Sequence, residues 1–473
     1  MKKIIFSTLA FAASLTMMGE GYQVNSLSVR QEGMGHTGVA QKLGAESMIF
    51  NPAGMAFMDK TVDLSVGVSP IFSDVSASLE DGRKFETDSK ASTPFQVSGA
   101  FSIYDNLKAG ITINTPYGSG IDWTDNWPGA VLSQSVKLQV FNIQPTIAYK
   151  ILPNLSVGAG LMIAWGTIDL NKGLVNSETF DKLLALNNVP EEYHLKGTTP
   201  ASVNLKGTAE VAFGFNVGAM WDINDKITLG VNYRSKMDMK VKSGDAKLSY
   251  ANDLAASQLS SITGLDGANF SAKLPAVSVL SLGICYKPIQ RLTLAFDAQL
   301  SGWSAYDKLD IDFLGDKLGS KFDQSLTKNY KDSWAYRFGA QYAMTDRLDL
   351  RAGFSIDTTP VDENYFNPET PGMTRLLPSF GLSFRPTEKL AIDLAFTYVA
   401  GCSRNGSNTY TDLLAAQAYQ IAYSTALEKG ASEEIAAATA GATATALGGV
   451  EKTFKAKYDL SALIPGIGIR YSF

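Results

Sequence analysis

The sequence predicts an all-β protein, a 14-stranded antiparallel transmembrane β-barrel, from three observations. Apolar and polar residues alternate along unusually long segments, short turns and long polar loops alternate between these segments, and aromatic residues gather at the segment ends. Alternation with period two gives a strand one apolar face and one polar face. A barrel that faces lipid on the outside and water in its lumen needs such strands.

The alternation is clearest between Ala209 and Trp221, and it recurs in residues 227–241, 292–300 and 390–398. These runs reach the 9–11 residues, roughly, that a tilted membrane strand needs, whereas ordinary globular strands have about 5–6. The aromatic residues at their ends suit the two membrane interfaces. They are Tyr104, Trp221, Tyr286, Trp303, Tyr342, Tyr398 and Phe473.

The connections alternate in length, which predicts both the strand count and the orientation. Six short Pro, Asn or Asp turns and seven long loops make thirteen connections, and therefore fourteen strands. Short turns on the periplasmic side, together with both termini, are typical of outer-membrane barrels, whereas a soluble sandwich or propeller has shorter strands. The turns lie near residues 105–106, 153–154, 224–225, 288–289, 345–346 and 386–387, and the loops span 77–91, 124–133, 171–203, 243–274, 305–331, 359–374 and 401–453.

The N-terminus predicts secretion. Lys2 and Lys3 precede an apolar run from Ile4 to Met18, which is the form of a secretory signal peptide, here residues 1–19. This run is shorter than the roughly 20 residues of a spanning helix. The formal net charge of −5 argues against nucleic acid as a partner. We therefore expect a multi-pass protein of a Gram-negative outer membrane.

Residues 20–60 have no strand period, and we expect them to form a hatch that plugs the barrel of residues 61–473. The segment is rich in Gly and Ser, yet it is too apolar for a disordered linker. A lumen this wide is not filled by its own side chains. Within the hatch, Pro52 fixes φ and Asn51 can bond its own backbone. The tripeptide Asn51-Pro52-Ala53 is thus predicted to fix the shape of the hatch.

Two of the long loops carry apolar residues at helical spacing, and we expect helices there. Their apolar faces either pack together or cradle a hydrophobic substrate in an outer capture groove. A third helical stretch, Leu413 to Ala446, is rich in alanine and has no assigned role. The groove residues are Phe180, Leu183, Leu184 and Leu186 in the first loop, and Leu254, Leu259, Ile262 and Leu265 in the second.

Residues that carry catalytic or metal chemistry are sparse. The chain has two histidines, His36 in the hatch and His194 in a loop, so a serine–histidine pair on one strand site is not expected. Cys285 and Cys402 fall at opposite ends of the predicted barrel, too far apart for a disulfide. We predict no enzyme activity, no metal and no cofactor.

A set of short motifs recurs in a fixed order along the mature chain, and as a set it resembles the FadL/TodX family of outer-membrane transporters for long-chain fatty acids and other hydrophobic compounds. The resemblance covers essentially the whole mature chain. The motifs are Gly21-Tyr22-Gln23-Val24-Asn25, Gly33-Met34-Gly35, Asn51-Pro52-Ala53, residues 109–120, Trp303-Ser304, residues 331–334, residues 357–361, and Arg375 with residues 378–381.

The resemblance implies passive uptake of a hydrophobic molecule. Outer loops capture it, a lumen pocket at the N-terminus receives it, and an inward kink in the third strand releases it sideways into the membrane. The sequence has no P-loop motif, so no ATP is expected, and an apolar solute gains about 0.8 kcal/mol per buried CH₂. A bulge at a barrel rim is the alternative explanation for the glycines of the kink. The implied residues are Tyr22, Val24 and Phe50 in the pocket, and Tyr117, Gly118, Ser119 and Gly120 in the kink.

Basic residues bear on whether the substrate carries a carboxylate. The period of residues 227–241 predicts that Arg234 and Lys236 face the lumen, where they either meet a head group or are solvated and paired. Strand five, Leu155 to Leu170, has no Arg or Lys, which leaves neutral hydrophobic compounds open as substrates.

The expected partners are outer-membrane lipid, lipopolysaccharide, and the barrel assembly machinery, which would read Phe473 on a monomer. The alternative function is a structural or adhesive barrel whose long loops bind a surface partner.

Overall fold

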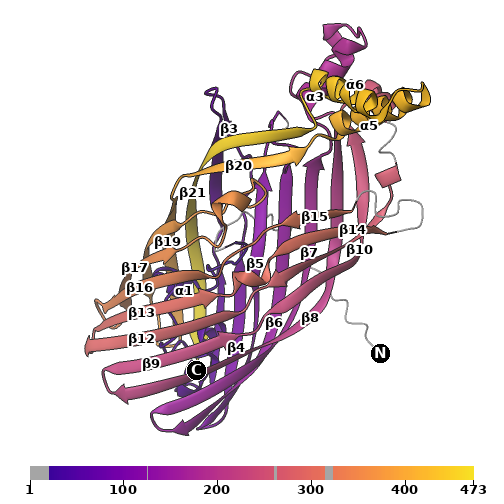
Figure 1. Ribbon diagram of the computed structural model, residues 1–473. Coiled ribbons are helices and arrows are strands. Elements are labelled where there is room, and N and C mark those ends of the chain that lie inside the picture. The colour runs from indigo at the N-terminus through magenta and orange to yellow at the C-terminus, as the bar shows by residue number, and fades with distance from the viewer. Residues whose placement is uncertain (1–20, 125, 260–263, 315–322) are drawn as a thin grey trace, which may run out of the picture.

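The computed structural model describes residues 21–124, 126–259, 264–314 and 323–473, so the predicted signal peptide lies outside the described residues. The strands form one antiparallel ring of fourteen, several of which consist of two consecutive elements (Figure 1). The ring closes where β1 pairs with β21, with Val66 opposite Ile469. The predicted fold class and strand count are confirmed.

The elements have the following bounds. The strands are β1 (Val62–Val68), β2 (Phe72–Ser78), β3 (Lys84–Glu86), β4 (Phe95–Tyr104), β5 (Leu107–Asp122), β6 (Ser135–Leu152), β7 (Leu155–Gly173), β8 (Ala201–Asn224), β9 (Ile227–Arg234), β10 (Met237–Tyr250), β11 (Asn269–Ala276), β12 (Val279–Ile289), β13 (Leu292–Ser301), β14 (Lys308–Leu314), β15 (Gln324–Thr327), β16 (Ser333–Ala343), β17 (Leu348–Asp357), β18 (Arg375–Phe384), β19 (Leu390–Gly401), β20 (Arg404–Thr411) and β21 (Glu451–Ser472). The helices are α1 (Val29–Glu32), η1 (Gly44–Glu46), α2 (Ser47–Phe50), η2 (Pro52–Phe57), α3 (Ser177–Leu186), η3 (Glu191–Tyr193), α4 (Asp253–Gln258), η5 (Trp303–Ala305), η7 (Glu363–Tyr365), α5 (Leu413–Glu428) and α6 (Glu433–Ala446).

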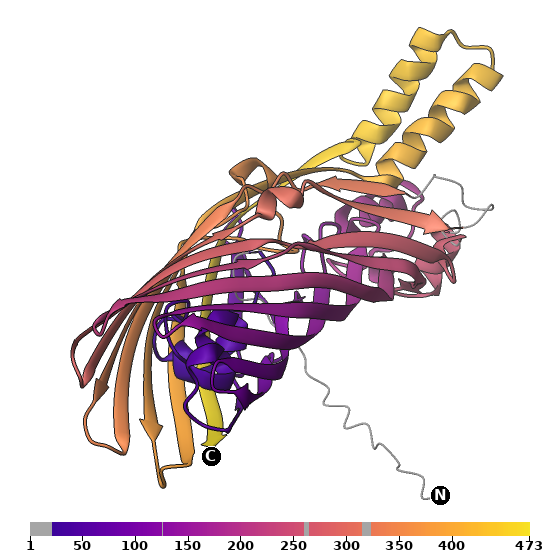
Figure 2. The same ribbon diagram turned by 90° about the horizontal axis from the view of Figure 1, so that it is seen from below.

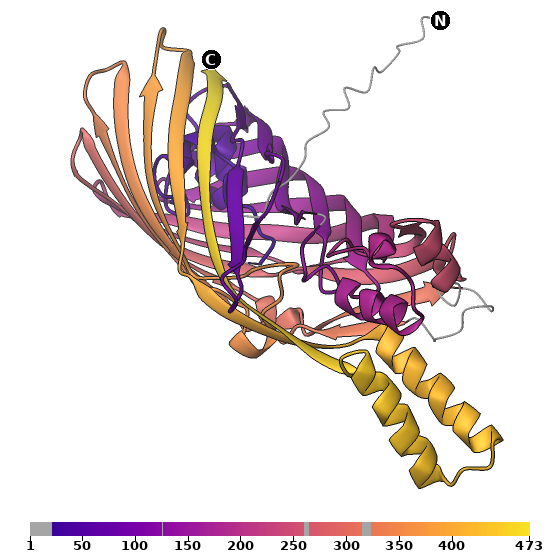
Figure 3. The same cartoon turned by 90° about the horizontal axis from the view of Figure 1, so that it is seen from above.

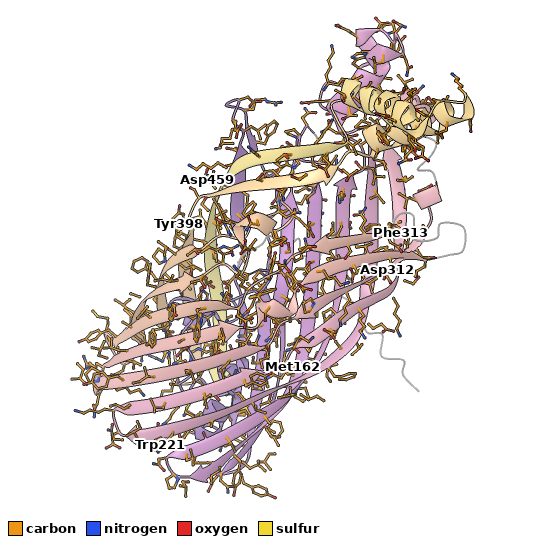
Figure 4. All side chains as sticks on the ribbon, viewed as in Figure 1. Met162, Trp221, Asp312, Phe313, Tyr398 and Asp459 are labelled. Carbon is orange, nitrogen blue, oxygen red and sulfur yellow. The ribbon has the colours of Figure 1, made fainter. Side chains whose placement is uncertain are left out.

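The barrel wall shows where the lipid band ends. On β8 the outward residues are apolar from Ile223 up to Val211, and Trp221 lies near the short-turn end of the barrel (Figure 4). Above Val211 the exposed residues of β8 are polar or charged, namely Glu210, Thr208 and Lys206. The longer strands therefore continue well beyond the membrane on the loop side. In the described part of the chain, no helix is long and apolar enough to cross a bilayer.

The alanine-rich stretch forms two helices, α5 and α6, which pack on each other as a hairpin. This hairpin projects away from the barrel at its loop end, which the view from above makes plain (Figure 3). Ala436, Ala440 and Ala444 are buried in it, and small side chains of this kind let two helices approach closely.

The predicted continuous strand of residues 227–241 is wrong. It breaks after Arg234, where the Ser235 Oγ accepts a hydrogen bond from the Phe215 N–H at 2.9 Å, and β10 begins at Met237. The two intervening residues reset the alternation, so Met237 is buried and Lys236 is exposed. Lys236 pairs with Asp238 at 3.3 Å. The prediction that Lys236 faces the lumen is therefore also wrong.

The hatch lies inside the barrel, near the end that carries the C-terminus (Figure 2). Wall side chains hold its backbone by hydrogen bonds. Asp297 on β13 accepts from the N–H groups of Gly38 at 2.6 Å and Val39 at 3.0 Å. Ser355 on β17 donates to the Gly35 carbonyl at 2.7 Å. Each bond satisfies a buried backbone group that has no strand partner.

Glycines in the wall leave room for the hatch backbone. A Cβ added at Gly353 would lie 1.9 Å from the Gly35 nitrogen, and one at Gly230 would lie 2.1 Å from the Val39 oxygen. Any other residue would displace the hatch at these positions. The glycines also pair across strands, as 158 with 218, 230 with 283, and 339 with 353. We call this set the glycine seat: Gly158, Gly218, Gly230, Gly283, Gly339 and Gly353.

Substitution Gly353→Ala tests the seat. Alanine suits a strand better than glycine, yet overpacking against Gly35 should cost about 1–3 kcal/mol. We expect a lower unfolding temperature and a higher ion conductance in planar bilayers as the hatch loosens. The matched control is Gly99→Ala, whose Cβ would meet only the Leu64 Cδ2 at 3.2 Å. Unchanged conductance and stability in Gly353→Ala would contradict the seat.

Candidate functional site

The first described residues of the chain lie in a buried aromatic cluster. The Tyr22 hydroxyl donates to the Pro275 carbonyl, and the Tyr22 ring meets the Trp303 ring edge-on, with 4.8 Å between centroids. Tyr306 and Tyr117 lie 5.8 Å and 6.2 Å from it. We call these four residues the Tyr22 pocket. At most 3% of each of these side chains is exposed, so the rings pack against one another and fill the space between them.

Trp303 was expected at the membrane interface, and this prediction is wrong. The chain leaves the wall after β13 and turns inward through η5, which places Trp303 over the N-terminus with none of its surface exposed. A Cβ at Gly21, whose φ is +59°, would lie 2.5 Å from the Trp303 ring. The Trp303 indole therefore packs directly on the first described residues of the hatch.

The predicted kink in the third strand coincides with a register shift in β5. β5 pairs with β4 only as far as Asn114, and its pairing with β6 shifts between Asn114 and Tyr117. Residues 114–121 are all buried, although a strand in a lipid-facing wall buries only every second residue. This stretch is thus withdrawn from the lipid surface.

The hatch takes the place of β4 beside the shifted stretch. The Gly118 N–H donates to the Tyr22 carbonyl at 2.9 Å, and the Val24 N–H donates to the Pro116 carbonyl at 2.9 Å. Gln23 and Tyr117 form an antiparallel bridge between these two bonds. The predicted pocket residue Tyr22 and the predicted kink residues therefore meet through backbone hydrogen bonds.

The other predicted hatch residues lie elsewhere. Val24 and Phe50 pack together in the hatch interior, apart from the Tyr22 pocket. The Asn51 Oδ1 accepts from the Ala53 N–H at 3.1 Å, which confirms the predicted bond to its own backbone. Its Nδ2 donates to Val39 at 2.8 Å. Asn51 and Pro52, the first residue of η2, therefore shape the hatch.

Between the long loops lies a cavity of about 690 Å³, which we call the outer cavity. Its wall mixes apolar with polar and charged residues and includes Phe313, which Figure 4 labels at the loop end of the barrel. Two lysines, Lys172 and Lys328, reach the same space. The aliphatic and Phe residues of the lining are Val131, Leu132, Val136, Leu170, Leu174, Val203, Leu205, Leu265, Leu309, Ile311, Phe313, Leu326 and Leu413.

The two lysines differ in their partners. Lys328 is 2% exposed and pairs with Glu369 at 2.7 Å. Lys172 is half-buried and donates to the Gln324 Oε1 at 3.3 Å. It lies nine residues beyond Ile163, which pairs with Phe213 in the lipid band, and so it stands outside the membrane. Burial lowers the pKa of Lys172, Glu369 opposes this shift, and the Lys328 charge adds to it.

Sequence reasoning missed Lys172 because β7 extends to Gly173, beyond the predicted end at Leu170. Its inward face continues from Ile168 through Leu170 to Lys172, so the alternation itself held the signal. Arg234, the predicted head-group residue, instead donates to the Ile49 carbonyl at 3.4 Å and helps to hold the hatch.

The predicted capture groove is mostly closed by its own helices. Phe180 and Leu184 have none of their surface exposed, Leu183 is half-buried, and Leu186 is exposed. The second helix, α4, is shorter than expected. In this region Leu254 is half-buried, Leu259 and Leu265 are buried, and Ile262 lies outside the described residues. Of the described groove residues, Leu265 alone lines the outer cavity.

Within the described ranges, no three His, Cys, Asp or Glu side chains are grouped to hold a metal ion. Cys285 is buried and Cys402 is exposed, and both are unbridged. The structure thus combines an outer cavity between the long loops, a buried aromatic cluster at Tyr22 and a hatch seated inside the barrel. These features define the class of plugged outer-membrane β-barrels.

The family described as outer membrane protein transport protein (OMPP1/FadL/TodX) matches residues 9–473, and the chain belongs to this family. Among curated relatives, outer membrane protein P1 of Haemophilus influenzae is 26% identical over 85% of this chain and 91% of its own length. The long-chain fatty acid transport protein of Escherichia coli O6:H1 is 25% identical over 85% of this chain and 92% of its own length. The family consists of outer-membrane transporters of hydrophobic compounds and not of enzymes, so the chain is assigned to the outer membrane.

Solved structures show the same fold. A Pseudomonas aeruginosa FadL homologue superposes with a TM-score of 0.74, at 19% identity, over 96% of this chain and 100% of that one. The Pseudomonas putida toluene transporter TodX has a TM-score of 0.64, at 17% identity, over 96% of this chain and 99% of its own.

Substitution Lys328→Met tests the buried pair above the Tyr22 pocket. It leaves the Glu369 carboxylate without its cation, which should cost about 3–5 kcal/mol. We expect faster amide hydrogen exchange in residues 323–331 and 363–372. The double variant Lys328→Met/Glu369→Leu removes both charges and should restore slow exchange. Equal exchange in the wild type and the single variant would show that the pair does not hold these loops.

Proposed function

We propose that the protein takes up hydrophobic molecules passively through three steps. The outer cavity captures the molecule, the Tyr22 pocket receives it, and the shifted stretch of β5 releases it sideways into the membrane. The observation that carries the proposal is the pairing of Tyr22–Val24 with residues 116–118, where β5 has left its partner β4. One segment thus contacts both the pocket and the opening in the wall.

The outer cavity suits capture because apolar side chains line it above the level of the lipid. Each CH₂ that moves from water onto such a surface gains about 0.8 kcal/mol. Lys172 can add a charge-assisted hydrogen bond to a carboxylate. Long-chain fatty acids therefore fit the cavity, and neutral hydrocarbons fit its apolar part.

Aromatic residues lead from the cavity to the Tyr22 pocket. Two residues beyond the cavity-lining Lys328, Tyr330 bonds Thr370 through its hydroxyl at 2.8 Å. Its ring lies 5.1 Å from Tyr306 and 5.9 Å from Trp303, which both touch Tyr22. A molecule that enters between these rings stays in apolar surroundings throughout.

The position of the hatch favours sideways release of the substrate over a straight path to the periplasm. The hatch backbone lies against the wall, so a straight path to the periplasm would require every seat contact to break. Beyond Asn114, β5 has no ladder with β4, and the segment between β3 and β4 is joined by isolated bridges, Thr87 with Trp123 at the end of β5 and Ile71 with Ser92 next to β2. The weaker barrier is therefore the gap between β5 and the wall of β1 and β2.

The same proposal includes the organisation of the chain and its partners. Residues 1–19 are removed as a signal peptide, 20–60 form the hatch and 61–473 the barrel. Phe473, which is 48% exposed at the end of β21, is the signal for barrel assembly. The mature protein works as a monomer in contact with outer-membrane lipid and lipopolysaccharide.

The double variant Gly118→Val/Gly120→Val tests lateral release. Branched side chains in the buried stretch should fill the gap and lower the uptake of both labelled oleate and a neutral alkylbenzene at least tenfold in cells. Gly99→Val, on the neighbouring strand β4, is the control and should transport normally. If neither uptake changes relative to a strain that lacks the protein, transport is excluded and a structural or adhesive barrel becomes the better explanation.

Substitution Lys172→Met separates charged from neutral substrates. We expect oleate binding to weaken about tenfold, the value of one lost charge-assisted bond of about 1.4 kcal/mol, while alkylbenzene binding is unchanged. Because the pKa of Lys172 is lowered, its charge is lost at a lower pH than for an exposed lysine. As the pH is raised, oleate binding by the wild type should therefore decline at a lower pH than the pH at which an exposed lysine loses its charge. Equal effects on both ligands would show that Lys172 only packs.

A further inference from the structure

On the outer surface of the barrel, at the upper ends of β7, β8 and β10, lies a second pocket of about 420 Å³. It opens on the outer face, because Ser202 and Ser249, which pair across β8 and β10, alternate with the inward residues Val203 and Leu248, and it borders the outer cavity only at Asn171. Its lining contains no charged residue. The lining residues are Asn126, Gln134, Asn171, Thr198, Thr199, Ser202, Ser249, Tyr250 and Ala251.

The chemistry of the lining identifies a class of ligand. Amide and hydroxyl groups both donate and accept hydrogen bonds, as sugar hydroxyls do. A phosphate or carboxylate would require a cation in the lining, and an apolar ligand would leave the polar groups unsatisfied. The pocket volume lies in the range of small-ligand sites, about 300–1,000 Å³. A neutral sugar ring meets all these conditions.

The polar groups are partly fixed and partly free. The Gln134 amide donates to Thr199 at 3.4 Å, and the Asn171 amide donates to Ser135 at 2.8 Å, which holds the floor in place. The Tyr250 hydroxyl is buried and has no hydrogen-bond partner among the described residues. Its ring packs on the loop core, which holds the hydroxyl beside the pocket.

The height of the pocket above the membrane indicates which molecule would carry the sugar. Nine residues of β8 separate Ser202 from Val211, the last outward apolar residue, which is about 30 Å along a strand. With a strand tilt of roughly 35–45°, the pocket stands roughly 20 Å above the hydrocarbon. This is the layer of the sugar chains that outer-leaflet glycolipids carry.

A row of lysines leads from the lipid band to the pocket. On the outward face of β10, Lys240, Lys242 and Lys247 are exposed and are followed by Ser249 in the pocket. Lys242 pairs with Glu210 at 2.6 Å, and Asp245 is exposed in the same row. On neighbouring strands, Lys206 and Lys273 face outward with 72% and 53% of their side chains exposed, near Asp169 and Asp238. Cations outnumber anions on this face.

We propose that this face binds one lipopolysaccharide molecule, an inference that rests on the lipopolysaccharide contact in the proposed function and assigns it a site. The lysine row contacts the phosphate groups near the membrane, and the pocket holds a neutral ring of the sugar chain above them. Lysines attract phosphate as point charges, so this contact contributes affinity that falls with salt. The uncharged pocket contributes the recognition of the sugar and is insensitive to salt.

The test uses the full-length protein purified in detergent, with binding of rough lipopolysaccharide followed by its effect on the fluorescence of a dye-labelled protein. The variant Ser249→Trp fills the pocket and should weaken binding at least tenfold, and Tyr250→Phe, which loses only the hydroxyl, about threefold to fivefold. The matched control Ser424→Trp, on exposed α5, should bind normally. Lys240→Gln/Lys247→Gln should weaken binding and reduce its dependence on salt.

Competition distinguishes the parts of the ligand. A free oligosaccharide released from the core region should compete in the wild type and fail to bind Ser249→Trp, whereas lipid A without core sugars should bind both equally. Retained transport of alkylbenzene in Ser249→Trp shows that the barrel is folded. Equal binding of lipopolysaccharide by Ser249→Trp and wild type, or equal affinity of the wild type for lipid A and for the sugar-bearing form, overturns the proposal.

Discussion

The contact between the hatch backbone and the glycine seat is the constraint on which the rest of the structure depends. At Gly230 and Gly353 the two backbones approach so closely that even one methyl group would overlap the hatch. Such contact closes the lumen without a packed core of large side chains. It also fixes where the hatch begins, and so places Tyr22 against Trp303 and β5. The site is therefore a consequence of how the plug is seated.

The pattern of polar groups follows from the same constraint. A hatch without strands exposes many backbone groups in a place that bulk water does not reach, and each unpaired group is costly. Side chains of the barrel wall, such as Asp297 and Ser355, form hydrogen bonds with individual N–H and carbonyl groups of the hatch. Above the hatch the outer cavity is lined by apolar strand residues such as Phe313 and also by polar and charged loop residues, among them Lys172 and the pair of Lys328 with Glu369. The lumen thus has a base of fixed polar contacts and, above it, a cavity of mixed lining.

Much of the fold follows from short-range pattern. Period-two alternation and turn residues suffice for fourteen strands, because each strand faces lipid on one side and the lumen on the other. The break at Ser235, which turns Lys236 outward, could not be predicted from this pattern. Two residues outside the strand ladder leave no signal in the composition. The prediction that Trp303 lies at the membrane interface was wrong because an aromatic residue at a strand end is compatible with both an interface position and an inward turn. The wall glycines were visible in the sequence, but their partners lie in the hatch, hundreds of positions away.

The candidate site depends on a single exchange of partners. A strand edge in a barrel must be paired, since unpaired backbone at membrane depth is unfavourable. β5 leaves β4 after Asn114, and the hatch supplies the missing partner with only two backbone hydrogen bonds, at Tyr22 and Val24. Two bonds satisfy the edge but hold it far less firmly than a strand would. The pairing of the β5 edge therefore depends on the position of Tyr22, and the proposed lateral route would couple displacement of Tyr22 to loosening of this edge.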